Sequence, residues 1–396
     1  MLSPIPDILD ELRAGRMVVL IDDEDRENEG DFVLAAEKVT PEAVNFMLTV
    51  ARGYMCLSLT PEDCDRLDLT PQSAVNTSVR GTPFTVSIDG HPKHGFTTGV
   101  SAAERARTIR LAIDPTSRPD DFVRPGHINP LRARTGGALV RTGQTEGSID
   151  LCRLAGLHPS AVIIEVMRAD GEMARVPDLE RLCAEHNLKM CSVAQVIQHR
   201  LERETLVTRA EPRDGVEIET DFGPFRLYAY ESVVDALPHV VLTVGDVGRP
   251  GPDGRAGETD EPTLVRMHRR RLLGDIFGGR EGEGSSRSDL EASMRALQRA
   301  GRGALIYLRP EGAGDGLEDR LLAIRRPERS ADAPPDLTEP GGDHAPSGQL
   351  REIGVGGQIL RDLGLRRLRL LTNHPRTLPG LDGFGLEIVE HVALAD

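Results

Sequence analysis

The sequence contains no tryptophan, and aromatic residues make up only 3% of its 396 residues. Proteins that stack nucleic-acid bases or enclose quaternary ammonium groups depend on aromatic side chains, so both classes are poorly supported here. Basic residues are also few, because 48 lysines and arginines stand against 63 aspartates and glutamates, a formal charge of −15. This excess of negative charge disfavours non-specific binding to nucleic acids and anionic lipids. We therefore predict neither a nucleic-acid partner nor a membrane partner.

Long hydrophobic runs are missing as well. Stretches such as residues 17–21 are far shorter than the roughly 18 apolar residues that a membrane-spanning helix needs. The first 16 residues contain acidic side chains where a secretory signal would carry basic and then apolar residues. Only five cysteines occur, and none follows Cys191, so we expect free thiols in a reducing compartment rather than disulfides or a metal framework. These features predict a cytoplasmic protein.

The length corresponds to two or three domains. In the first half, apolar periodicity predicts helices over residues 8–12, 177–186 and 192–200, and strands over residues 17–21, 85–88 and 161–166. The charged stretch 202–214, which contains Pro212, is the best candidate for a linker. We therefore predict a first domain over residues 1–205 and a second over residues 213–396.

The second half also mixes strands and helices. An alternating segment covers residues 216–230, and the other predicted elements are strands over 240–244, 304–308 and 368–371 and a helix over 290–300. Two segments, residues 245–262 and 327–349, have no periodicity and are expected to be long or disordered loops. The predicted fold class is therefore mixed, α+β or α/β, in both halves, without an internal repeat.

Seven carboxylates within residues 22–31 are the strongest local signal in the sequence. A run of charges is usually a solvated surface, but this run directly follows a predicted buried strand, and Gly30 permits a tight turn among the acids. Like charges at a strand end repel one another unless a cation or a basic substrate neutralises them. Because Mg²⁺ prefers one or two carboxylates together with water and substrate phosphate, the run favours a divalent-metal site.

Arginines beside glycine-rich turns occur in residues 124–134 and 136–146. Guanidinium groups and backbone N–H groups in such turns can surround a phosphate. His127 lies in the first of these segments and can transfer protons near neutral pH, although a loop histidine is more often structural. Glu165 lies among aliphatic residues, where an unpaired carboxylate would have the raised pKa of a general acid or base; a paired core carboxylate is the alternative interpretation.

Six segments together resemble the 3,4-dihydroxy-2-butanone 4-phosphate synthases of riboflavin biosynthesis, namely residues 22–31, 84–89, 97–102, 124–134, 150–157 and 171–175. The resemblance covers nearly all of residues 5–200. It implies the synthase fold and a lyase that converts D-ribulose 5-phosphate into 3,4-dihydroxy-2-butanone 4-phosphate and formate. It also implies a sugar-phosphate substrate, Mg²⁺ or Mn²⁺ as the cofactor, and a homodimer.

The resemblance further implies roles for single residues. His127 and Glu165 are expected to be catalytic, and Glu27 is expected to bind the metal. The implied substrate-binding residues are Arg26, Glu27, Asp31, Arg141, Thr142, Gly143, Gln144 and Thr145. Gln144 stands where the family has a second metal-binding histidine, and an amide oxygen is a neutral and less basic ligand. We expect Gln144 to take the place of that ligand and to weaken the activity.

The second half resembles GTP cyclohydrolase II, which follows the synthase in many bifunctional riboflavin enzymes. The three positions of the family's zinc-binding cysteines are here Arg271, Gly282 and Gly284. We therefore expect no zinc and a catalytically inactive second domain, since zinc would activate the hydrolytic water. The family's phosphate-binding arginine and lysine positions have also changed, to Ala313 and Thr377, while Arg351 remains at the position of its catalytic arginine.

A different class of function remains open. Gln144 is also compatible with a pseudoenzyme that acts as a scaffold or a regulator of the riboflavin pathway. Against this alternative, the sequence keeps nearly all of the side chains that the chemistry needs, namely Arg26, Glu27, Asp31, His127 and Glu165.

Overall fold

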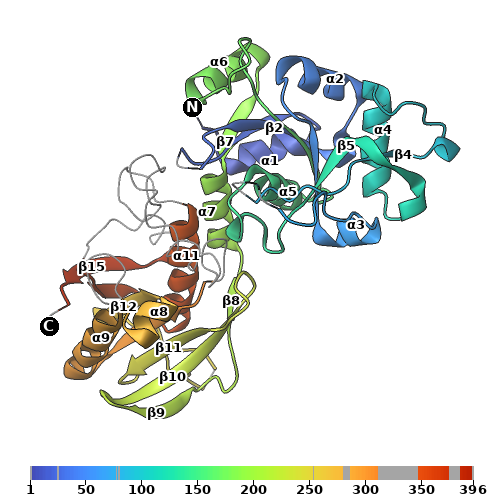
Figure 1. Ribbon diagram of the computed structural model, residues 1–396. Helices are drawn as coiled ribbons and strands as arrows, with labels where there is room; N and C mark the ends of the chain where they lie inside the picture. The colour runs from blue at the N-terminus through green and yellow to red at the C-terminus, as the bar shows by residue number, and fades with distance from the viewer. Residues whose placement is uncertain are drawn as a thin grey trace. The chain divides into compact units, whose positions relative to one another are not determined.

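The computed structural model describes residues 2–24, 26–76, 78, 81–252, 254–279, 286–310, 347–373 and 384–394. The chain divides into two compact units, Met1–His199 and Arg200–Asp396, each built around its own sheet (Figure 1). Within the described part of the chain, no helix combines the length and the apolar character needed to cross a membrane.

The first unit contains a mixed seven-stranded sheet in the order β4-β5-β3-β6-β2-β1-β7. Its strands are β1 Val18–Ile21, β2 Gly30–Ala35, β3 Cys56–Leu59, β4 Ile88–Gly90, β5 Phe122–Arg132, β6 Ala161–Glu165 and β7 Lys189–Ser192. Strands β1, β2 and β3 are buried along their whole length, as expected for apolar strands covered on both faces. β1 and β2 pair antiparallel, so the acidic residues 22–29 form the turn between two buried strands.

Helices cover this sheet, and several begin at a side-chain cap. They are α1 Ile5–Arg13, α2 Pro41–Val50, α3 Pro61–Arg66, α4 Ala102–Ile113, α5 Gln144–Leu154 and α6 Val176–His186, with 3₁₀ turns at Ala36–Lys38, Pro92–His94, Pro119–Asp121 and Gly137–Leu139. A further helix, α7 Val193–Arg203, contains the boundary between the two units. α2 packs against α4, and α1 against α5 (Figure 1). α5 lies so close to the sheet that a Cβ on Gly147 would approach Leu20 Cδ2 to 2.9 Å. The N-terminus of α5 is therefore fixed against strand β1.

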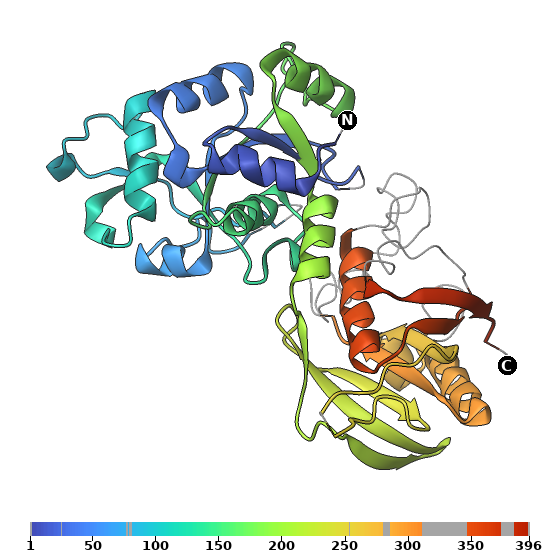
Figure 2. The ribbon, with the colours of Figure 1, turned by 180° about the vertical axis from the view of Figure 1, so that it is seen from behind.

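The second unit contains an eight-stranded sheet in the order β15-β14-β12-β13-β11-β10-β8, with β9 paired to β10. Its strands are β8 Val207–Arg209, β9 Val216–Thr220, β10 Gly223–Ser232, β11 His239–Val244, β12 Thr263–Arg269, β13 Gly303–Leu308, β14 Arg367–Leu371 and β15 Glu387–Val392. The described helices are α8 Leu272–Phe277, α9 Ser286–Ala300 and α11 Ser347–Asp362. β12, β13, β14 and β15 run parallel, whereas β10 and β11 form an antiparallel pair that both views show side by side (Figures 1 and 2).

The mixed fold class predicted from the sequence is confirmed, but two local predictions differ from the structure. In the segment predicted as a strand over 85–88, regular pairing begins only at Ile88. Thr85 donates its N–H to the carbonyl of Pro130 at 3.0 Å, and Pro130 has no N–H to return, so the ladder is interrupted there. The predicted linker 202–214 contains the end of α7 and strand β8, which pairs with β10 because Val207 is buried.

The two aperiodic segments differ in how much of them the structure describes. Residues 245–262 contain neither a regular strand nor a helix where they are described, as the sequence predicts. Residues 327–346 lie outside the described residues, and residues 347–349 belong to α11.

Candidate active site

The acidic turn between β1 and β2 is organised around Asp22. Its carboxylate accepts the N–H of Glu27 at 3.1 Å and the N–H of Glu29 at 2.9 Å. The Asp22 side chain is fully buried, so these bonds replace the water that the carboxylate gives up. The turn also needs a left-handed residue, Asn28, at φ +55°. Asp22 thereby fixes the backbone that carries Glu27.

Three side-chain oxygens converge on one guanidinium nitrogen of Arg26. Nη1 lies 2.8 Å from Asp22 Oδ2, 2.6 Å from Glu27 Oε2 and 2.9 Å from Gln144 Oε1, so that its two N–H groups are shared among three acceptors. A positively charged group therefore already lies among oxygens from the turn and from α5. Among the described residues, no three His, Cys, Asp or Glu side chains form a metal cluster by themselves. The Gln144 amide supplies the third oxygen of this group. We call the group the oxygen cluster and define it as Asp22, Glu27 and Gln144.

Gln144 is the first residue of α5 and is buried. Its Oε1 accepts from Arg26, while its Nε2 has no hydrogen-bond partner within the described structure. The residue before it, Gly143, is the N-cap of the helix, and a Cβ there would lie 2.7 Å from Arg141 Nη1 and 3.0 Å from Arg26 Nη2. Glycine therefore allows two guanidinium groups to approach the N-terminus of α5, with the buried Thr145 in its first turn.

Arg141 is held by a buried acid. Its Nη1 contacts Glu146 Oε2 at 2.6 Å, and Glu146 Oε1 accepts the backbone N–H of Arg134 at 3.1 Å. Burial raises the pKa of Glu146, although the neighbouring Arg141 opposes that shift. The Arg141 guanidinium is thus held near Gly143, at the start of α5, and Thr142 between them is partly buried.

Asp31 and Glu165 are direct neighbours in the sheet, since they are register partners in the antiparallel pair β2–β6. Asp31 Oδ1 is buried without a hydrogen-bond partner in the described residues. Burial, with the negative charges of Glu165 and Asp22 adding to it, raises the pKa of Asp31 well above its ordinary value. Glu165 accepts the N–H of Tyr54 at 2.8 Å, yet burial still raises its pKa. This direction matches the raised pKa that the sequence suggests for Glu165, while its catalytic role stays a prediction.

His127 lies on β5 and is oriented by Asp89, a residue that the sequence analysis did not select. Asp89 Oδ2 is 2.6 Å from His127 Nδ1, and Asp89 Oδ1 accepts the His127 N–H at 3.0 Å. The imidazole is 46% exposed, whereas the Asp89 side chain is 8% exposed. Because the Asp89 carboxylate binds Nδ1, Nε2 is the ring nitrogen that remains available to a ligand. No hydrogen bond of the described residues links His127 to the oxygen cluster.

A second residue missed from the sequence is Arg175, at the N-cap of α6. Its Nη1 donates to the carbonyl oxygen of Glu27 at 2.8 Å and to that of Asn28. α6 also packs against the start of β2, because a Cβ on Gly30 would lie 2.5 Å from Leu179 Cδ1. Arg175 and α6 therefore support the backbone of the turn that carries Glu27.

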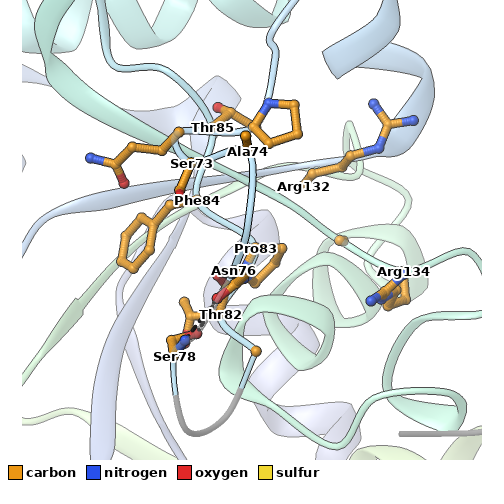
Figure 3. A pocket seen from close by; sticks show the side chains of 14 residues that line it. Ser73, Ala74, Asn76, Ser78, Thr82, Pro83, Phe84, Thr85, Arg132 and Arg134 are labelled. Atoms are coloured by element: carbon orange, nitrogen blue, oxygen red, sulfur yellow. Dashed lines mark hydrogen bonds between the residues drawn. The ribbon is translucent and has the colours of Figure 1, made fainter. Parts of the chain in front are cut away.

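A cavity of about 350 Å³ lies beside this region, between the loop 71–85 and the end of β5 (Figure 3). Asn76, Thr82 and Phe84 line it from the loop, and Arg132 and Arg134 from the strand end. None of the ten side chains predicted for the site lines this cavity. One of its lining residues, Arg134, donates its backbone N–H to Glu146.

In the second unit, the expected zinc position Arg271 is the N-cap of α8, and its N–H donates to Asp275 Oδ2 at 2.8 Å. Asp275 also accepts from Tyr307 at 2.7 Å and contacts His268 at 3.1 Å, and together these bonds lower its pKa despite burial. The other two positions, Gly282 and Gly284, lie outside the described residues, as do Ala313 and Thr377.

Arg351, at the position of the cyclohydrolase catalytic arginine, is buried in an ion pair. Its Nη2 is 3.0 Å from Asp235 Oδ1, and the other carboxylate oxygen is 3.3 Å from His239 Nε2. His239 in turn accepts the N–H of Arg309 at 3.0 Å. Asp235, His239 and Arg351 are all buried, so the arginine is engaged within the unit.

Comparison with known proteins divides the chain into the same two parts as the structure does. Residues 6–199 match the family of 3,4-dihydroxy-2-butanone 4-phosphate synthases, and residues 211–393 match the GTP cyclohydrolase II family. Riboflavin biosynthesis protein RibBA of Aquifex aeolicus is 47% identical over 99% of this chain and 92% of its own length. RibBA of Bacillus subtilis is 44% identical over 100% of this chain and 94% of its own.

A solved two-domain structure shows the same relationship over the whole chain. RibBX, a two-domain 3,4-dihydroxy-2-butanone 4-phosphate synthase from A. baumannii, covers all of this chain and all of its own at 36% identity, with a TM-score of 0.78. A synthase solved in complex with two magnesium ions is 40% identical and covers 51% of this chain and 98% of its own, with a TM-score of 0.49. The chain belongs to the RibBA family of riboflavin biosynthesis proteins, and it is a 3,4-dihydroxy-2-butanone 4-phosphate synthase, a lyase.

Proposed function

We propose that this lyase converts D-ribulose 5-phosphate into 3,4-dihydroxy-2-butanone 4-phosphate and formate at the turn 22–29 and the N-terminus of α5, with Mg²⁺ or Mn²⁺ as its cofactor. The observation that carries this proposal is the convergence of Asp22, Glu27 and Gln144 oxygens on the cationic nitrogen of Arg26. The same oxygens suit a hard divalent ion, which takes carboxylate and amide oxygens together with water and substrate. Glu27 and Gln144 are the proposed protein ligands.

Held by Glu27 and Gln144, such an ion would supply positive charge that stabilises negative charge developing on substrate oxygens. The residues around Gly143 hold the phosphate end of the substrate. Arg141 supplies a guanidinium, and the first turn of α5, with Thr142, Gly143 and Thr145, supplies N–H and hydroxyl donors at the positive end of a helix. An anionic phosphate is favoured there for both reasons.

Two groups are proposed to move protons. His127, oriented by Asp89 through Nδ1, presents Nε2 as the nitrogen that exchanges a proton with the substrate. Glu165 has a pKa raised by burial, the direction of shift that suits a general acid or base. Asp31, buried and with an unpartnered oxygen, is placed to bind a substrate hydroxyl that donates to it.

The experiment that tests the site is a Mn²⁺ titration of the full-length protein and of Glu27→Gln, followed by formate release from ribulose 5-phosphate. We expect Glu27→Gln to lose both metal affinity and formate production. Glu24→Gln, in the same turn but exposed, removes the same charge and is the matched control that keeps both. Unchanged metal affinity in Glu27→Gln would remove this residue from the metal site.

We also propose that the second unit neither holds zinc nor hydrolyses GTP. Arg271 cannot act as a zinc ligand in place of cysteine, and Arg351 is engaged with the buried Asp235. RibBX, which this chain matches over its full length, is likewise described as a two-domain synthase. Elemental analysis and a GTP hydrolysis assay of the full chain test this proposal, and stoichiometric zinc or released formate from GTP would overturn it.

The proposed form of the enzyme is a cytoplasmic homodimer. All five cysteines are free and buried in the first unit, as is typical of proteins from reducing compartments. A two-fold dimer is the form implied by the family resemblance and is the commonest soluble assembly. Sedimentation at micromolar concentration tests the dimer, and a monomer there would contradict it. If the purified protein released no formate with any divalent ion, the scaffold or regulator alternative would replace the catalytic proposal.

A further inference from the structure

Arg26 occupies a position between two parts of the site. Its Nη1 donates to the oxygen cluster, Asp22, Glu27 and Gln144, at 2.6–2.9 Å. Its Nη2 lies near the N-cap of α5, since a Cβ on Gly143 would be 3.0 Å from it and 2.7 Å from Arg141 Nη1. One guanidinium group therefore spans the distance from the oxygens proposed for the metal to the helix N-terminus proposed for the phosphate.

The oxygens that Arg26 binds are the ones that a divalent ion needs. A guanidinium N–H and a metal ion compete for the same lone pairs of Glu27 and Gln144, and two cations so close together would repel each other. The Asp22 side chain is fully buried and requires a positive partner in either state, because an unpaired buried carboxylate is costly. Arg26 provides that partner whenever no metal ion does.

We propose that Arg26 is the resident counter-ion of the oxygen cluster, that a divalent metal ion binds by displacing its guanidinium, and that the displaced group turns to the phosphate of the substrate. This inference rests on the proposed metal site at Glu27. In this proposal Arg26 is a positioning residue that couples the binding of two ligands. An anion at the N-terminus of α5 draws the guanidinium away from the oxygen cluster and so favours metal binding, and a bound metal ion favours anion binding in the same way. Linkage requires that the coupling be equal in both directions.

The test is Mn²⁺ affinity of the full-length protein without substrate, measured by electron paramagnetic resonance of free Mn²⁺. A residue that served only the substrate would leave this affinity unchanged. Displacement predicts that Arg26→Met binds Mn²⁺ about tenfold or more tightly than the wild type, because charge-assisted hydrogen bonds no longer have to be broken. Arg168→Met removes an equal charge from an exposed ion pair with Asp170 and should leave the affinity unchanged.

A second variant separates displacement from the general effect of charge, and it also serves if Arg26→Met does not fold. Arg26→Lys keeps the positive charge but has a single nitrogen with fewer donors than the guanidinium fork. Displacement predicts tighter Mn²⁺ binding than in the wild type, whereas general electrostatics predicts no change. Equal or weaker binding in Arg26→Lys would overturn the inference.

The coupling is tested with inorganic phosphate as the anion. We expect phosphate to tighten Mn²⁺ binding in the wild type and to have no such effect in Arg26→Met. Coupling that persists in Arg26→Met would show that another group carries it and would refute the role of Arg26. Glu27→Gln separates a wrong displacement from a wrong metal site. If Glu27→Gln keeps full Mn²⁺ affinity, the proposed metal site itself is misplaced. If Glu27→Gln loses Mn²⁺ affinity while the Arg26 variants gain none, the metal site stands and only the displacement is wrong.

Discussion

Restoring the family's histidine at position 144 is the most informative perturbation of the metal site. Gln144 contributes one neutral oxygen that already accepts from Arg26 at 2.9 Å, and its buried Nε2 has no partner in the described structure. A buried donor without a partner costs about 1–3 kcal/mol, so the amide is poorly matched to this position when no ligand is bound. In Gln144→His, an imidazole nitrogen is a stronger metal donor, and only one N–H remains to be satisfied.

The expected size of the effect follows from what metal sites lose when a supporting group is altered, which is commonly about 10- to 100-fold in affinity or activity. We expect Gln144→His to tighten Mn²⁺ binding and to raise formate production by a factor in that range. The gain should be lost on acidification through about pH 6.5, the ordinary histidine range, because a protonated imidazole cannot bind metal. Metal titration and formate release at several pH values measure both effects.

Gln72→His is a suitable control, since it adds an imidazole to an exposed position elsewhere in the first unit. If the wild type is fully active and Gln144→His is worse, the site has adapted to the amide, and the view of Gln144 as a weakness is wrong. If both proteins are inactive, the deficiency lies elsewhere and the scaffold alternative becomes the better one.

Three further predictions concern residues around this site. Asp89→Asn should lower kcat by about tenfold or more through loss of the charge-assisted bond to His127, with little change in KM; equal kcat would refute the role of Asp89. Asp31→Asn should raise the free energy of unfolding of the metal-free protein at pH 8. Because the folded-state pKa of Asp31 is raised, the wild type loses stability as the pH rises above the ordinary aspartate range, and the gain from Asp31→Asn should vanish near pH 4. A gain that does not depend on pH would contradict this reasoning. Arg175→Met should weaken Mn²⁺ binding by loosening the carbonyls of Glu27 and its neighbour, whereas Arg181→Met, which alters an exposed ion pair, should not.

The sequence predicted most buried elements because their apolar periodicity is local. The strand expected at 17–21 is β1, and the helices expected at 177–186 and 192–200 are α6 and α7, with boundaries shifted by a few residues. It failed where pairing across the sheet decides the outcome. The strand expected at 85–88 is interrupted because Pro130, 45 residues away, cannot donate a hydrogen bond.

The candidate site was predicted to a similar degree. The acidic turn and Glu165 were identified from local charge and burial, and the structure brings Arg26, Glu27 and Gln144 together across 118 residues. Asp89 and Arg175 were missed because each acts on a residue far along the chain: Asp89 lies 38 residues before His127, and Arg175 lies 148 residues after Glu27. Neither has a local pattern that marks it, since an acid in a short strand and an arginine before a helix are common.

The buried Arg351 in the second unit has a consequence for tracing how such domains change over evolutionary time. If Arg351 were lost while Asp235 stayed, a buried carboxylate would be left without its cation, a change that typically costs about 3–5 kcal/mol. Selection for folding alone would therefore be enough to preserve this arginine, whether or not the domain keeps a hydrolytic activity. The presence of Arg351 is thus weak evidence for catalysis, whereas side chains that serve only a metal, such as zinc-binding cysteines, are more informative.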